Sequence, residues 1–74
     1  MPKLPRLTGR HLIAALRKLG FGVIRIKGSH HYLRHPDGRR TVVPVHTGET
    51  IGPGLLTRIL AEADITVETL REVI

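Results

Sequence analysis

Apolar residues recur at helical spacing near the start of the chain. They form one stripe, which consists of Leu12, Ala15, Leu16 and Leu19. Positions with a period of about 3.6 residues share one face of a helix, and an apolar face packs against a core. Thr8 suits the N-cap of this helix, and Gly20 suits the position that follows its last turn. The pattern predicts a helix between these two residues.

Between residues 21 and 45 the apolar period changes from helical to alternating, which indicates β-strands. The predicted strands are residues 21–27, 31–35 and 40–45. A Gly-Ser pair separates the first two, and a His-Pro-Asp-Gly turn separates the last two. Pro44 favours an edge position or a bulge near the end of the third strand. Such short connections predict an antiparallel sheet with its strands in chain order.

A second helix is predicted to begin at Pro53, because proline suits the first turn. Its apolar stripe consists of Leu55, Leu56, Ile59, Leu60 and Ala63. Asp64 tolerates the conformation that ends a helix, and Thr66 suits the N-cap of a last short helix to about Val73. Residues 1–74 are therefore expected to form one α+β domain with the order α-β-β-β-α and a short extra C-terminal helix. This order resembles that of double-stranded-RNA-binding domains.

Charge is unevenly distributed along the chain. Residues 1–40 contain ten Lys or Arg and one acid, whereas residues 41–74 contain two Lys or Arg and five acids. A cationic half of this kind indicates a polyanionic partner such as a nucleic acid. Phe21 and Tyr32 are the only aromatic residues, so we expect recognition through backbone charge and shape and not through base stacking.

The composition also narrows the class of protein. The chain has no cysteine, which excludes disulfides and thiolate ligands. No apolar run approaches the roughly 20 residues of a membrane span, and the first residues lack the apolar core of a secretory leader. We therefore expect a cytoplasmic protein without membrane contact.

The alternation of residues assigns the strand side chains to the two faces of the expected sheet. In the first strand, Ile24 and Ile26 are expected to face the helices, so that Arg25 and Lys27 lie on the open face. This first strand should therefore make the open face basic.

In the second strand Leu33 is the obvious core residue, so His31 is expected to share its face. His30, Tyr32 and Arg34 then point to the open face. A bulge or a slip of one residue would exchange the places of the two adjacent histidines.

A histidine on a basic face has the properties of a ribonuclease base. Imidazole has an unperturbed pKa of about 6.5 and exchanges protons near neutral pH. His30 could remove the proton of an RNA 2′-hydroxyl while neighbouring cations stabilise the phosphorane, leaving a 2′,3′-cyclic phosphate and a 5′-hydroxyl. The Gly28-Ser29 turn allows a phosphate to approach the backbone closely. The competing interpretation of His30 is a polar surface side chain without catalytic function.

Four histidines raise the question of a metal site: His30, His31, His35 and His46. The expected parity separates His30 from His31, and no spacing matches a zinc-binding pattern. We therefore expect neither a metal nor another cofactor.

Several short strings resemble the HicA family of toxins in their sequence and in their order along the chain. They are Leu19-Gly20-Phe21, Lys27-Gly28-Ser29-His30-His31, His35-Pro36-Asp37-Gly38-Arg39, Val43-Pro44-Val45-His46 and Gly54-Leu55-Leu56-Thr57-Arg58-Ile59-Leu60. The resemblance extends from about residue 8 to residue 66. Asp64, where many relatives carry glycine, and Pro53 depart from the family pattern.

The resemblance implies an mRNA interferase with a double-stranded-RNA-binding-like fold, in a type II toxin–antitoxin pair with a HicB antitoxin. It implies His30 as the catalytic residue, because the family's histidine follows the Gly-Ser or Gly-Gly turn, with His31 as the alternative. The antitoxin is expected to cover this surface and to block RNA. The free toxin could be a monomer.

The residues expected to contact RNA are Arg25, Lys27, Gly28, Ser29, Arg34, Arg39 and Arg40. A module that binds RNA without cleaving it is the alternative function. A DNA-binding regulator has less support, because the chain shows no clear helix-turn-helix.

Overall fold

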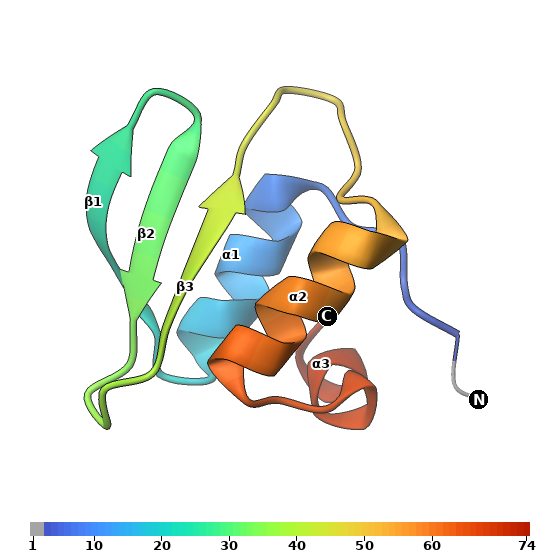
Figure 1. Ribbon diagram of the computed structural model, residues 1–74. Coiled ribbons are helices and arrows are strands. Elements are labelled where there is room, and N and C mark those ends of the chain that lie inside the picture. Colours follow the sequence, from blue (N-terminus) through green and yellow to red (C-terminus); the bar gives the residue numbers. More distant parts are fainter. Residues whose placement is uncertain (1–2) are drawn as a thin grey trace.

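The computed structural model describes residues 3–74. Its elements are α1 (Gly9–Lys18), β1 (Gly22–Lys27), β2 (His30–Arg34), β3 (Arg40–Pro44), α2 (Pro53–Ala63) and α3 (Val67–Val73). The strands form one antiparallel sheet in the order β1-β2-β3, and the helices lie on one side of it (Figure 1). The predicted α+β class and the order α-β-β-β-α with a short C-terminal helix are confirmed. Within the described residues, no helix has the length and apolarity needed to cross a membrane.

Local capping explains where α1 begins and ends. The Thr8 hydroxyl accepts a hydrogen bond from the His11 backbone N–H at 3.2 Å, which satisfies one of the free donors of the first turn. After the last turn, Gly20 has a φ of +99°, a conformation that glycine adopts readily. The Phe21 N–H then donates to the Leu16 carbonyl at 3.0 Å and closes the helix end. The predicted helix limits are confirmed.

Local signals also explain where the two C-terminal helices begin and where α2 ends. Pro53 occupies the first turn of α2, and Asp64 ends that helix in the left-handed conformation with a φ of 53°. The Thr66 hydroxyl accepts a hydrogen bond from the Thr69 N–H at 3.1 Å and caps α3. These short-range signals were all readable in the sequence.

The core lies between the sheet and the three helices. Its largest fully buried side chains are Leu12, Leu16, Leu33, Val43, Leu56, Ile59 and Leu70. In Figure 1, β3 lies beside α1 and α2, whereas β1 forms the edge of the sheet far from α2. The β1–β2 hairpin therefore extends beyond most of the helical layer.

One prediction for β1 is wrong. Val23 pairs with Leu33 and Arg25 pairs with Tyr32, so Ile24 is an extra residue in a β-bulge. Ile24 therefore does not face the helices and is 60% exposed. Ile26 pairs with His31 and lies on the predicted side, yet it is 59% exposed because the helices do not cover this edge.

Candidate functional site

The open face of the sheet carries a histidine among cations. His30 pairs with Lys27 on one side and with Pro44 on the other. Leu33 is buried, so strand alternation places His30 on the face away from the core. The polar residues that share this face are Arg25, Lys27, His30, Tyr32, Arg34 and Arg40. We call these six residues the basic open face.

Register brings these residues close to one another in pairs. The Arg25 guanidinium lies 5.8 Å from the centre of the Tyr32 ring, a cation–π contact. Arg34 and Arg40 are directly paired at the other end of β2. Like charges opposite each other are unfavourable unless an anion lies between them, so this pair is suited to a phosphate.

The β1–β2 turn is open to a ligand and fixed at its base. Gly28 has a φ of +59°, and nothing lies within 4 Å of the place where its Cβ would be. The Ser29 carbonyl accepts a hydrogen bond from the Val45 N–H at 2.7 Å, which ties the turn to the chain after β3. The predicted turn residues thus lie directly beside His30.

The two adjacent histidines lie on opposite faces of the sheet, as predicted. The bulge is in β1, and β2 pairs regularly with β3 through His30–Pro44 and His31–Val43. His30 is exposed, whereas His31 is half-buried on the helix side. Nδ1 of His31 lies 3.3 Å from the Ser29 carbonyl oxygen, which orients the ring.

Two arginines that the sequence pattern had not indicated lie near His31. Arg10 and Arg17 of α1 line a surface hollow together with His31. Their spacing of seven residues places them on one side of the helix, two turns apart. That spacing, outside the apolar stripe, is the signal that could have indicated them.

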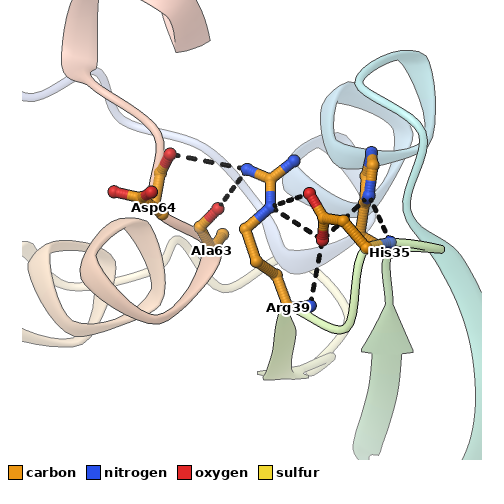
Figure 2. Close-up of polar contacts among 5 residues, drawn as sticks. His35, Arg39, Ala63 and Asp64 are labelled. Carbon is orange, nitrogen blue, oxygen red and sulfur yellow. Dashed lines mark hydrogen bonds and ion pairs between the residues drawn. The ribbon is translucent and has the colours of Figure 1, made fainter.

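Arg39 does not lie with the other predicted RNA contacts. Its Nε is 2.8 Å from Asp37 Oδ2, and its Nη1 donates to the Ala63 carbonyl at 2.7 Å (Figure 2). The guanidinium also lies 5.2 Å from the centre of the Phe21 ring. Arg39 is thus half-buried in contacts within the domain, whereas its neighbour Arg40 is exposed on the open face.

The turn between β2 and β3 is held by the same cluster. The Asp37 N–H donates to His35 Nδ1 at 3.1 Å, and the His35 ring packs edge-on against Phe21 with centres 5.2 Å apart. The hydrogen bond from the Arg39 backbone N–H, supported by the Arg39 guanidinium, lowers the pKa of Asp37 below its ordinary value. The His-Pro-Asp-Gly-Arg string therefore builds a turn and fastens it to the helices.

Residues 3–74 contain no cluster of side chains suited to binding a metal ion. No group of three or more His, Asp or Glu there lies close enough to hold an ion. His30 and His31 are on opposite faces, and His35 is engaged in the turn.

These features define a class of protein: a small α+β domain that presents a histidine within a basic sheet surface. A family model described as HicA toxin of bacterial toxin-antitoxin matches residues 9–65, which is 57 of the 74 residues. The chain belongs to this HicA toxin family and is a toxin of a toxin–antitoxin system, which implies an antitoxin partner. A search of curated proteins finds no match.

Proposed function

We propose that this toxin is a metal-independent endoribonuclease that cleaves mRNA with His30 as general base and thereby inhibits translation and growth. The observation that carries the proposal is the position of His30, which is exposed and paired with Lys27 on the basic open face. The family adds support, because its toxins act with an antitoxin that must suppress a harmful activity.

The proposed reaction is a transesterification within the RNA chain. The His30 imidazole takes the proton of the 2′-hydroxyl, and the 2′ oxygen forms a bond to phosphorus. The bond from phosphorus to the 5′ oxygen breaks, that oxygen takes a proton from water, and the imidazolium returns the 2′ proton to the hydroxide that remains. The products carry a 2′,3′-cyclic phosphate and a 5′-hydroxyl. Proton transfer of this kind contributes about 10²–10⁴-fold in rate.

The cations around His30 have two functions in this reaction. Lys27, paired with His30, is placed to stabilise the charge that develops on the phosphorane. Arg34 and Arg40 pair at the far end of β2 and hold the RNA backbone of flanking nucleotides. The exposed backbone at Gly28 and Ser29 admits a phosphate beside His30.

The antitoxin partner is proposed to be a HicB-like protein that covers the basic open face. Cover at this face would exclude RNA from His30 and remove the attraction of its cations for phosphate. Because mRNA is the proposed substrate, the cytoplasm is the proposed compartment.

Cleavage of an RNA transcript in the presence of EDTA tests the proposal. Wild-type protein is compared with His30→Ala, with His31→Ala and with His11→Ala, an exposed histidine on α1 as matched control. We expect the cleavage rate of His30→Ala to fall about 10²–10⁴-fold. His11→Ala should cleave like wild type, and the fragments from these two active proteins should carry cyclic phosphate ends.

Two results would contradict this assignment. Loss of cleavage only in His31→Ala moves the base to the helix side of the hairpin. Salt-sensitive binding without any cleavage, in wild type and variants alike, supports the alternative of a non-catalytic RNA-binding module.

A further inference from the structure

A surface hollow lies on the helix side of the β1–β2 hairpin, on the opposite face from His30. It has a volume of about 370 Å³. Arg10 and Arg17 of α1 line one side, and Ile26 and His31 of the hairpin line the other. The hollow exists because the helices leave this edge of the sheet uncovered.

The α1 side of the hollow combines charge with apolar surface. Arg10 and Arg17 are seven residues apart, which separates their Cα atoms by about 10.5 Å along the helix axis. Ile13 and Ala14 lie between them and also line the hollow. Both arginines are exposed, and none of the described lining residues is acidic. This side therefore presents two guanidinium groups on either side of an apolar surface.

The opposite side supplies an oriented imidazole. His31 is half-buried, and its Nδ1 lies 3.3 Å from the Ser29 carbonyl oxygen. A ring whose Nδ1–H donates to that carbonyl keeps its Nε2 for a ligand in the hollow. Nearby, Ile26 is 59% exposed and supplies apolar surface.

We propose that this hollow binds two phosphates of an RNA chain whose next nucleotides pass over the hairpin tip to His30. The inference rests on the proposed function and extends its substrate surface to the second face of the hairpin. His30 and His31 are adjacent in β2, so only the thickness of the hairpin separates the two sites. At the tip, Gly28 has open space around it, which allows the chain to pass.

An RNA backbone fits this lining better than an acidic protein segment does. Two spaced cations with an apolar surface between them match the alternation of phosphate and ribose along a single strand. The basic open face continues from the same hairpin, where Lys27 pairs with His30. One strand can thus contact cations on both faces.

Salt dependence of RNA binding tests the subsite. The parent protein is His30→Ala, which leaves labelled single-stranded RNA uncut, and affinity is measured by fluorescence anisotropy at several salt concentrations. We compare Arg10→Gln/Arg17→Gln with Arg6→Gln/Arg58→Gln, which removes two exposed cations elsewhere. Loss of two phosphate contacts makes the negative slope of log K against log salt less steep by about 1.4. Between 50 and 200 mM salt, the parent's advantage in affinity over Arg10→Gln/Arg17→Gln, the hollow variant, should shrink about sevenfold.

The outcomes separate this inference from the proposed nuclease activity. A salt dependence of RNA affinity that becomes less steep only in the hollow variant supports the subsite, even if the wild type fails to cleave. Equal slopes for the two double variants overturn it, whatever the cleavage assay gives, and so does an absence of RNA binding by the parent. If the hollow variant retains its affinity for RNA but loses affinity for a Glu-rich peptide, the hollow belongs to a partner protein, and this result also overturns the inference.

Discussion

Replacement of Arg39 by alanine distinguishes a side chain that stabilises the fold from one that binds RNA. The guanidinium joins two distant parts of the chain, the turn after β2 and the C-terminal end of α2 (Figure 2). The last carbonyls of a helix lack partners within the helix, and a cation there is favourable. Arg39 supplies that cation to the Ala63 carbonyl at 2.7 Å.

The size of the effect follows from the contacts that are lost. A hydrogen bond from a charged donor to a partly buried carbonyl contributes about 1.5–3 kcal/mol. The Asp37 ion pair is exposed to solvent and adds little, and the cation–π contact with Phe21 contributes about 0.5–1 kcal/mol. Because such terms are not additive, we expect a loss of about 2–3 kcal/mol. For a domain of this size, that lowers Tm by roughly 10–20 °C.

Thermal unfolding followed by circular dichroism measures the change, with Arg40→Ala as the matched control. Arg40 is the adjacent arginine, exposed on the open face, so its removal should leave Tm nearly unchanged and weaken RNA binding. Arg39→Lys should recover only part of the stability, because an ammonium group lacks the planar fork of the guanidinium. Equal Tm values for Arg39→Ala and Arg40→Ala would refute the reasoning.

Two further predictions concern backbone packing and acid stability. Gly9→Ala should lower stability by about 1–3 kcal/mol, because its Cβ would overlap the Pro44 carbonyl oxygen. Gly54→Ala in α2 meets nothing within 4 Å and should raise stability by about 0.5–1 kcal/mol; opposite signs in urea unfolding check the pair. The pKa of Asp37 is lowered in the folded state, so its contribution is present above pH 3.8 and is lost as the pH falls through the folded pKa. The Tm advantage of wild type over Asp37→Asn should therefore shrink below that pH, and a constant difference would contradict it.

The helices were predictable because their signals are local. Thr8, Gly20, Asp64 and Thr66 each act on residues within one turn, so the chain itself carries the information. The face of the sheet on which His30 lies was also predictable. Leu33 is apolar and buried in the core, and strand alternation puts His30 on the opposite face.

The bulge at Ile24 and the role of Arg39 could not be predicted in the same way. A bulge depends on how β1 pairs with β2, and the alternation of apolar and polar residues within β1 does not indicate the extra residue. Arg39 contacts Ala63, 24 positions away, and nothing in the sequence around the turn indicates that partner. Its place beside Arg40 suggested a second surface cation, whereas the fold uses it as a tether.

The two ends of β2 are therefore fixed by different means, and this difference bears on the site. Near Arg39, side chains fasten the β2–β3 turn to α2 and to Phe21. Near His30, the fixing is by backbone, through pairing with Lys27 and through the hydrogen bond from Val45 to Ser29. Because backbone pairing places His30, the side chains of Lys27 and Arg34 are not needed to hold the histidine and remain available to a ligand. The backbone of β2 thus fixes the place of His30, and the side chains beside it are left to meet whatever binds the basic open face.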